Sequence, residues 1–268
     1  MGRDSRLTKI AVFGLGEAGS EISRDLAEAG ADVSGFDPAD VATPPGVSRV
    51  AAAAEAVESA ELVLALIAGT DAGVAVRQAI EAIPAGSVYA DFSSSAPGFK
   101  CELAKVAAGA ELLFVDVALM STVPGKGIHT PMLASGPGAD AFVAALEPFG
   151  ASIEAVGSGP GEAATRKLLR SVVVKGVAAL LIESMRGAHE AGLAFETWQN
   201  VMRQLADADE AFIRRMIEGT GPHARRRRDE MAAAVLLLEE LGVPSSMTRA
   251  TVESLDTVLA DGTPDLPD

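Results

Sequence analysis

Short, largely apolar segments alternate with helical stretches along the first 160 residues of the chain. Seven of these segments have the length of buried strands, and they span residues 10–13, 31–36, 61–67, 87–92, 112–117, 130–135 and 152–156. Alanine-rich stretches between them predict helices at residues 20–29, 72–82, 100–108 and 139–146. Such a β-α-β rhythm is typical of a parallel sheet with helices on both faces. The pattern therefore predicts an α/β fold with a doubly wound parallel sheet.

The pattern changes after the glycine-rich segment at residues 157–161. Beyond it the sequence predicts helices alone, at residues 162–191, 195–218, 223–241 and 247–259. We therefore predict two domains: a sheet domain over residues 1–160 and an all-helical domain over residues 161–268.

The first helix of the predicted helical domain is apolar almost all the way round. Its apolar residues are Leu168, Leu169, Val172, Val173, Val174, Val177, Leu180, Leu181 and Ile182. A helix with no polar face is expected to be buried on every side. Because a surface that apolar must be covered, we expect the helical domain to form a homodimer.

The strongest motif lies where the first predicted strand ends. Gly14-Leu15-Gly16-Glu17-Ala18-Gly19 follows the strand directly, a helix comes next, and the second strand ends at Asp37. This order is the fingerprint of a Rossmann-type dinucleotide-binding domain. Gly14 permits the tight turn, Gly16 lets the backbone approach a pyrophosphate, and Gly19 allows close packing of helix on strand, while the helix N-terminus offers N–H donors. The sequence therefore predicts a bound dinucleotide.

Asp37 indicates which dinucleotide is bound. A carboxylate there would accept hydrogen bonds from ribose hydroxyls and repel a 2′-phosphate, which favours NAD, with NADP as the alternative. The other interpretation is that Asp37 only starts the turn at Pro38. Because ligands lie beyond the carboxyl ends of parallel strands, Ile67, Ala68 and Ser93 complete the predicted cofactor-binding set.

Composition excludes several classes of protein. The formal net charge of −15 argues against nucleic acid, whose phosphates would be repelled. The single cysteine, Cys101, excludes an internal disulfide framework and fits a reducing cytoplasm. The polar first nine residues do not resemble a signal peptide, and no apolar stretch is long enough to span a bilayer. With three histidines and no clustered ligands, we predict no metal site.

Three polar residues recur at intervals of four along the apolar helix, and so share one face: Lys167, Ser171 and Lys175. A buried ammonium needs a partner or a purpose. For Lys167, just behind the glycine-rich junction, we predict a catalytic role. Lys175 is equally well explained by pairing with carboxylates or by reaching solvent.

These motifs together resemble the β-hydroxyacid dehydrogenase superfamily, which includes 3-hydroxyisobutyrate dehydrogenase and the cofactor domain of 6-phosphogluconate dehydrogenase. The cofactor loop is similar, with Glu17 where methionine is common. The run Asp91-Phe92-Ser93-Ser94-Ser95-Ala96-Pro97 resembles the family's Asp-x-Ser-Thr-x-x-Pro segment near nicotinamide and substrate. Asp116-Val117-Ala118-Leu119-Met120-Ser121-Thr122 stands in the place of its substrate loop, and the segment from Gly161 to Lys167 resembles the one that carries the catalytic lysine.

The resemblance implies hydride transfer between nicotinamide and a small anionic, β-hydroxyacid-like substrate. Lys167 and Ser171 are then catalytic, and Ser94, Ser121, Thr122 and Lys175 bind substrate. Two departures from the family matter, because Ser171 replaces an asparagine and Met120 a serine. The similarity is greater to a subgroup whose helical C-terminal domain has a poorly defined function.

Lys167 is the candidate general acid/base, since a group must take the hydroxyl proton in oxidation and return it in reduction. A free lysine has a pKa of about 10.4, and we expect burial and the charge of Lys175 to lower the pKa of Lys167. The serines are equally compatible with ordinary turn chemistry. The run Arg225-Arg226-Arg227-Arg228 after His223 predicts a solvated face, or alternatively an arginine that closes over an anionic substrate.

Other functions remain open from the sequence. An imine reductase shares this architecture, but those enzymes usually lack a lysine at the position of Lys167. A pyrroline-5-carboxylate reductase would continue Gly157-Ser158-Gly159-Pro160 with Ala-Tyr, which is missing, and a full 6-phosphogluconate dehydrogenase needs a longer helical region. From a different class, a non-catalytic NAD(P)-binding protein would tolerate the changes at Met120 and Ser171.

Overall fold

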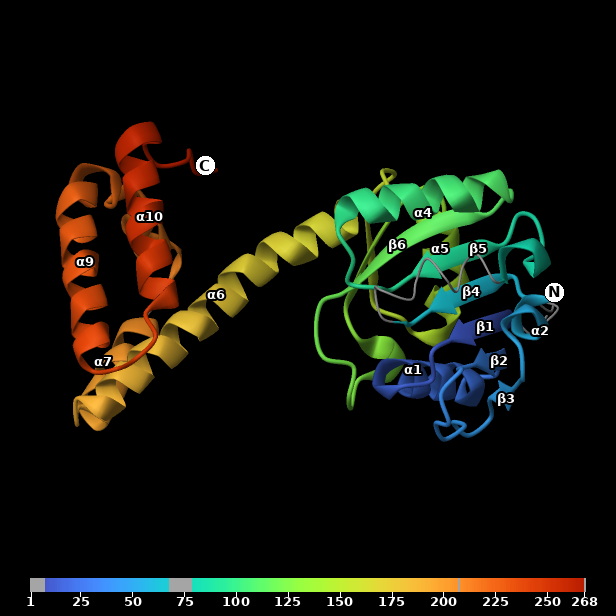
Figure 1. The fold of residues 1–268 in the computed structure, drawn as a ribbon. Coiled ribbons are helices and arrows are strands. Elements are labelled where there is room, and N and C mark those ends of the chain that lie inside the picture. Colours follow the sequence, from blue (N-terminus) through green and yellow to red (C-terminus); the bar gives the residue numbers. More distant parts are fainter. Residues whose placement is uncertain (1–7, 68–78, 207, 268) are drawn as a thin grey trace. The chain divides into compact units, whose positions relative to one another are not determined.

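The computed structural model describes residues 8–67, 79–206 and 208–267. The chain divides into two compact units, Met1–Arg170 and Ser171–Asp268 (Figure 1). None of the described helices is long and apolar enough to cross a membrane.

The first unit is built on one eight-stranded sheet. Its strands are β1 (Lys9–Phe13), β2 (Asp32–Phe36), β3 (Ser48–Arg49), β4 (Leu62–Ala65), β5 (Val88–Asp91), β6 (Leu113–Leu119), β7 (Met132–Ser135) and β8 (Ile153–Gly157). Their order, β3-β2-β1-β4-β5-β6-β7-β8, starts with the order of a dinucleotide-binding sheet. All seven predicted strands are present. β3 was not predicted, because a two-residue strand is too short to show a hydrophobic pattern.

One strand pairing differs from the predicted parallel sheet. β6 and β7 are antiparallel, with Asp116 opposite Ser135, whereas the other neighbours are parallel. A parallel pair needs a crossover connection, usually a helix. Between β6 and β7 the chain has only the short 3-10 helix η2 (Gly127–His129), so it turns back beside the strand it has just left. The sheet is mostly parallel, and the predicted α/β fold is confirmed.

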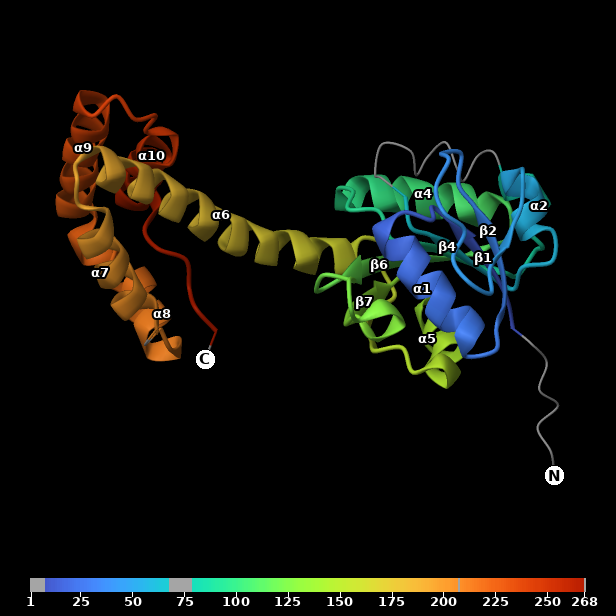
Figure 2. The same cartoon turned by 90° about the horizontal axis from the view of Figure 1, so that it is seen from below.

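Helices cover both faces of this sheet (Figure 2). On one face α1 (Glu17–Glu28) and α5 (Ala139–Leu146) pack against strand residues such as Val12 and Val115. On the other face lie α2 (Ala53–Val57) and α4 (Pro97–Gly109). α4 begins three residues earlier than predicted, because Pro97 suits the first helical turn. Of the helix predicted at 72–82, residues 72–78 lie outside the described residues and Ile80–Ala82 is a 3-10 helix, η1; another 3-10 helix, η3 (Glu147–Phe149), follows α5.

The remaining helices are α6 (Glu162–Glu190), α7 (Ala194–Ala206), α8 (Glu210–Glu218), η4 (Gly221–His223), α9 (Ala224–Glu240) and α10 (Ser246–Asp261). The single helix predicted at 195–218 is two helices. Asp209 caps α8, because its side chain accepts a hydrogen bond from the N–H of Phe212 at 2.7 Å. Aspartate at such a position favours a new helix start over a continuing one.

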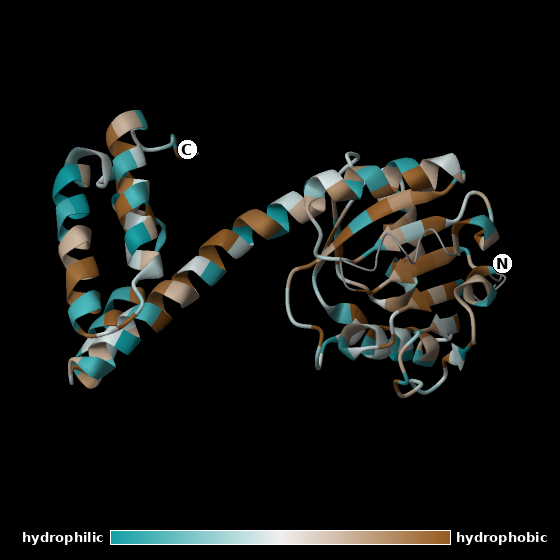
Figure 3. Ribbon diagram, viewed as in Figure 1, coloured by the Kyte–Doolittle hydropathy of each residue, from teal (hydrophilic) through white to brown (hydrophobic). Residues whose placement is uncertain are grey.

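The apolar side chains of α6 are not buried within this chain. Val172 is 71% exposed and Leu169 66%, and hydrophobic residues recur along the whole helix in Figure 3. The expectation of a helix buried on every side is therefore wrong for the single chain. Among the described helices of the second unit, α9 packs mainly on α10, so much of the apolar surface of α6 stays uncovered.

Candidate functional site

The glycine-rich loop between β1 and α1 has the geometry that its sequence predicts. Gly14 adopts a φ of +87°, and its N–H donates to the carbonyl of Phe36 at 2.9 Å. A Cβ at Gly19 would lie 1.8 Å from the Gly14 carbonyl oxygen, whereas a Cβ at Gly16 would meet nothing within 4 Å. Gly14 and Gly19 therefore close the turn, and Gly16 leaves open space above it.

This loop fits a dinucleotide. Gly16 is the N-cap residue of α1 and has no side chain to occupy the helix N-terminus, so the first-turn N–H groups can bind a phosphate. Leu15 is buried, whereas Glu17 is exposed and Ala18 half-buried. Ile67 lies beside Gly14, where a Cβ on the glycine would be 3.0 Å from its Cγ2. Ala68 lies outside the described residues.

Asp37 takes part in the same loop. Its Oδ2 accepts a hydrogen bond from the N–H of Leu15 at 2.7 Å, and its Oδ1 accepts one from the N–H of Ala39 at 2.8 Å. A carboxylate has about four lone-pair sites, so these bonds fix its orientation and leave acceptors for ribose hydroxyls. The turn interpretation and the ribose interpretation are therefore compatible.

A cation that the sequence did not indicate lies close to Asp37. Arg49, at the end of β3, donates to the carbonyl oxygens of Asp37 at 3.2 Å, Ala39 at 2.6 Å, and Val41. It thus holds the loop that follows β2. No signal in the sequence indicated this contact, because β3 itself was not recognisable.

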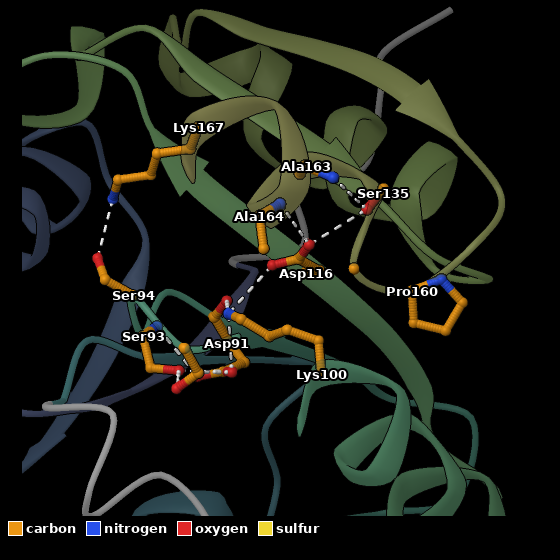
Figure 4. Close-up of polar contacts among 12 residues, drawn as sticks. Asp91, Ser93, Ser94, Lys100, Asp116, Ser135, Pro160, Ala163, Ala164 and Lys167 are labelled. Carbon is orange, nitrogen blue, oxygen red and sulfur yellow. Dashed lines mark hydrogen bonds and ion pairs between the residues drawn. The ribbon is translucent and has the colours of Figure 1, made fainter. Parts of the chain in front are cut away.

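A second group of predicted residues meets beyond β5 and β6. The Nζ of Lys167 donates to the Oγ of Ser94 at 3.0 Å (Figure 4). Ser93, Ser94, Asp116, Ala164 and Lys167 line one small hollow with Ser95, Val117, Ala118 and Leu168. The structure thus brings Lys167 together with the predicted serines at the carboxyl-end edge of the sheet, where ligands of such folds bind.

The remaining predicted substrate residues are spread more widely. Ser121 accepts a hydrogen bond from Lys126 Nζ at 2.6 Å, and Arg170 Nη1 donates to the carbonyl of Met120 at 2.8 Å. Thr122 is exposed on the same loop. Ser171 and Lys175 follow in the second unit, half-buried and exposed respectively.

Near Ser94 lies a buried ion network that the sequence did not indicate. Lys100, Asp91 and Asp116 have fully buried side chains, and Lys100 Nζ lies 2.9 Å from Asp91 Oδ2 and 3.0 Å from Asp116 Oδ1 (Figure 4). The same Nζ donates a hydrogen bond to the Asp91 carbonyl oxygen at 3.0 Å. The two aspartates were visible as motif residues. Lys100 was not, because a lysine in a helix is ordinarily solvated.

Nearby polar groups complete this network. Asp91 accepts hydrogen bonds from the N–H of Ser93 at 3.1 Å and from its hydroxyl at 2.9 Å. Asp116 Oδ2 accepts one from the N–H of Ala164 at 2.8 Å and one from the Ser135 hydroxyl at 3.4 Å. Burial, and then the charge of Asp91, raise the pKa of Tyr89 far above its ordinary value, so this phenol stays neutral.

The arginine run of α9 contacts its own unit. Arg226 pairs with Glu230 at 3.7 Å, Arg227 donates to the Thr220 hydroxyl at 2.8 Å, and Arg228 pairs with Asp256 at 3.1 Å. These contacts favour the solvated-face interpretation. Within the described parts of the chain, no three His, Cys, Asp or Glu side chains are grouped so that they could hold a metal ion.

The sheet order, the glycine loop and the aspartate after β2 together define a dinucleotide-binding fold of the oxidoreductase type. Residues 9–157 match the family described as the NAD binding domain of 6-phosphogluconate dehydrogenase. The match covers more than half of the chain, which therefore belongs to this family. The predicted NAD(P) cofactor class and the family resemblance are confirmed. Residues 188–258 match a domain of unknown function, DUF1932, as the resemblance to a subgroup implied.

Solved structures share the fold over nearly the whole chain. A conserved hypothetical protein from Sinorhizobium meliloti 1021 is 29% identical, with a TM-score of 0.63 and coverage of 97% of this chain and 92% of that one. A variant imine reductase from Myxococcus stipitatus in complex with NAD+ is 14% identical, with a TM-score of 0.79 and 96% coverage of both. A reductive aminase from Aspergillus terreus in complex with NADPH4, cyclohexanone and allyl amine is 15% identical, with a TM-score of 0.77 and coverage of 96% and 95%. At such identities the last two show the fold alone.

A curated relative, an uncharacterized 28.5 kDa protein from Methanothermus fervidus, is 32% identical over 144 residues. That alignment covers 54% of this chain and 55% of the relative. The chain thus spans about half the length of the curated relative it matches.

Proposed function

We propose that the chain is an NAD(P)-dependent dehydrogenase that transfers a hydride between nicotinamide and a small, anionic hydroxyacid-like substrate, with Lys167 as general acid/base. The observation that carries this proposal is the contact of Lys167 Nζ with Ser94 Oγ, 3.0 Å long, at the carboxyl-end edge of the sheet. A lysine with a hydroxyl partner at this edge suits proton transfer to a substrate oxygen.

Each site residue has a defined task in this reaction. A bound nicotinamide supplies the acceptor or donor of the hydride. In oxidation, neutral Lys167 takes the proton of the substrate hydroxyl, and in reduction its ammonium returns that proton. Ser94 orients the lysine by accepting its hydrogen bond. Ser121, Thr122 and Lys175 bind the substrate's anionic group, and Ser171 contacts the substrate hydroxyl from the face of α6 that also carries Lys167.

In this proposal the pyrophosphate binds to the cofactor loop, which consists of Gly14, Leu15, Gly16, Glu17, Ala18 and Gly19. The nicotinamide side of the cofactor contacts Ile67, Ala68 and Ser93. Asp37 selects NAD through the ribose hydroxyls, since its carboxylate would repel a 2′-phosphate. Calorimetric titration with NAD and NADP tests this selection: Asp37→Ala weakens NAD binding about tenfold or more, the loss of one or two charge-assisted hydrogen bonds. Asp40→Ala, an exposed neighbour, serves as the matched control. Tighter binding of NADP than of NAD by the wild type would contradict this selection, and Arg49 would then be the candidate that binds the 2′-phosphate.

The reaction itself is tested with Lys167→Met and Lys167→Arg. Both variants should lose about 10²- to 10⁴-fold in kcat for oxidation of a panel of small hydroxyacids, with the Kd for NADH unchanged. Lys105→Met, an exposed lysine of α4, is the control. Full turnover by Lys167→Met would disprove the assigned role.

A second candidate is reduction of C=N bonds, favoured by the likeness to imine reductase structures. The same variants separate the two functions, because Lys167→Met should leave reduction of a preformed cyclic imine intact if the chain is an imine reductase. Binding of NADH without turnover of either panel would indicate a non-catalytic binding protein.

The proposal extends to assembly and location. A homodimer through the helical domain would cover the exposed apolar side chains of α6. We also propose a domain boundary at residue 160. A cytoplasmic location is proposed as well, because the single cysteine fits a reducing compartment.

A further inference from the structure

We propose that Lys100 is a positioning residue for Ser94 and Lys167, because it joins the segment that carries Ser94 to the helix that carries Lys167. This inference rests on the role proposed for Lys167. Lys100 lies on α4, and its fully buried ammonium reaches neither residue directly. It acts through Asp91 and Asp116 (Figure 4).

The two aspartates need a cation between them. Asp91 and Asp116 are register partners on the parallel strands β5 and β6, and both side chains are fully buried. Neighbouring carboxylates without water between them repel strongly. Among the described residues Asp116 Oδ1 accepts no hydrogen bond, and its charge is balanced by the ion pair with Lys100 Nζ at 3.0 Å.

One arm of the network leads to Ser94. Asp91 Oδ1 and Oδ2 bind the N–H and the hydroxyl of Ser93. The Ser93 hydroxyl also contacts that of Ser95 at 2.9 Å. The loop after β5 is thus fixed on both sides of Ser94, and its position follows that of Asp91.

The other arm leads to Lys167. Asp116 Oδ2 binds the N–H of Ala164 in the first turn of α6, where the helix dipole also favours a negative charge. The Ser135 hydroxyl, which donates to Asp116, accepts the N–H of Ala163 at 3.0 Å. Lys167 lies one turn beyond Ala164 on the same helix. The position of its ammonium therefore follows that of Asp116.

This arrangement is costly as a means of stability alone. Taking three charges out of water costs free energy that a cluster of apolar side chains would not cost. The network lies where the segments carrying Ser94 and Lys167 meet, which gives its charges a purpose at the site.

The network also carries charge near Lys167. Two carboxylates and one ammonium leave a net charge of −1. Among the described residues, the groups that donate hydrogen bonds to these carboxylates are neutral: the hydroxyls of Ser93 and Ser135 and the N–H groups of Ser93 and Ala164. The Tyr89 phenol near Asp91 is neutral as well. Removing Lys100 makes the region more negative, which favours the protonated form of Lys167. Removing the charge of Asp116 has the opposite effect.

The test is competitive labelling of folded protein with trace acetic anhydride at pH 8, with Lys167 and exposed Lys9 quantified by mass spectrometry. Only a neutral amine reacts. Lys100→Met should slow labelling of Lys167 about threefold or more relative to Lys9, and Asp116→Asn should accelerate it. The double variant Lys100→Met/Asp116→Asn should return toward the wild-type rate, because it restores the net charge of −1. Lys105→Met, on the same helix, should have no effect.

These outcomes separate positioning from folding and from the proposed reaction. Every variant should still bind NADH, because the glycine loop at β1 and α1 has no contact with the network; among the described residues proposed to bind the cofactor, only Ser93 is held by it. If Lys100→Met fails to fold, the double variant should still label Lys167 more slowly than Asp116→Asn does. Equal Lys167 labelling in all variants would overturn the inference, whereas full turnover by Lys167→Met would overturn only the proposed reaction. With a substrate in hand, Lys100→Met should lower kcat by a larger factor than it raises KM for NADH.

Discussion

The two units of this chain treat their apolar residues in opposite ways. In the sheet unit, Val12, Leu64 and Val115 are completely buried between helices on both faces. In the helical unit, Val172, Val173 and Trp198 are 71%, 65% and 53% exposed. Helices on both faces of the sheet bury its apolar side chains within one chain. The helices beside the long apolar helix α6 leave many of its side chains exposed. The difference is that the first unit buries its apolar core within one chain, whereas the second leaves apolar side chains exposed, as the proposed dimer requires.

The buried charges of the two units differ as well. In the sheet unit three charged side chains meet at the edge where the proposed site lies. In the helical unit Glu183 of α6 is buried and accepts hydrogen bonds from the N–H groups of Met247 and Thr248 and from the Thr248 hydroxyl. That carboxylate binds the first turn of α10. The first network is the one proposed to position the site, and the second joins α6 to α10.

The largest expected effect lies in the sheet core. Phe142 is completely buried and contacts Phe92 edge to face at 6.1 Å. Phe142→Ala should lower the free energy of unfolding by about 3–5 kcal/mol, the transfer and cavity cost of a buried phenylalanine. Urea unfolding followed by circular dichroism measures it. The fluorescence of Trp198, the single tryptophan, reports on the helical unit and should change little. A parallel shift of both signals would show that the two units unfold as one.

A second prediction concerns the exposed face of α6. Replacing both Val172 and Val173 by lysine should weaken the proposed dimer at least about 100-fold, or about 2.7 kcal/mol. Sedimentation velocity over a range of concentrations measures the change. Val106→Lys, at a valine of the sheet unit that is 38% exposed, is the matched control and should leave the dimer intact. A wild-type protein that stays monomeric at every concentration would contradict the proposed pairing.

The smallest effect should come from Glu183. Burial raises the pKa of its carboxyl, but the hydrogen bonds from Thr248 and Met247 outweigh burial and hold that pKa below its usual value. A depressed pKa stabilises the folded state above the unfolded pKa of about 4.3, and this contribution is lost as pH falls through the folded pKa. Glu183→Gln should lower the free energy of unfolding by about 1 kcal/mol at pH 7. It should also reduce the loss of that free energy between pH 7 and pH 3.

Trp198 fluorescence during urea unfolding at pH 3 to 7 measures this prediction. Glu190→Gln, at an exposed position on the same helix, should keep the wild-type profile. An unchanged acid dependence in Glu183→Gln would show that other carboxyls control it.

Much of the fold could be predicted from the sequence, because strands of a sheet that is buried on both faces consist of continuous apolar runs. All seven predicted strands are present, and the glycine loop has the predicted turn at Gly14. The two-residue strand β3 was not readable, nor was the reversal at β7, because both depend on how the chain folds back. The start of α8 could have been found from Asp209, which is a favoured N-cap residue.

For the candidate site, the sequence supplied single residues and the structure supplied their neighbours. The motifs indicated Ser94 and Lys167, and their 3.0 Å contact appears only in the fold. Arg49 near Asp37 carried no signal, since a two-residue strand holds it. Lys100 looked like an ordinary surface lysine of a helix.

The sequence by itself determined the dinucleotide-binding fold, the division into a sheet part and a helical part, and the residues around the cofactor loop. These follow from local rules: periodicity, glycine at turns, and an acid after the second strand. Only the tertiary structure decided the exposure of α6, the direction of β7 and the burial of Lys100 between Asp91 and Asp116. Each of these depends on segments far apart in the sequence, whose contacts no local pattern records.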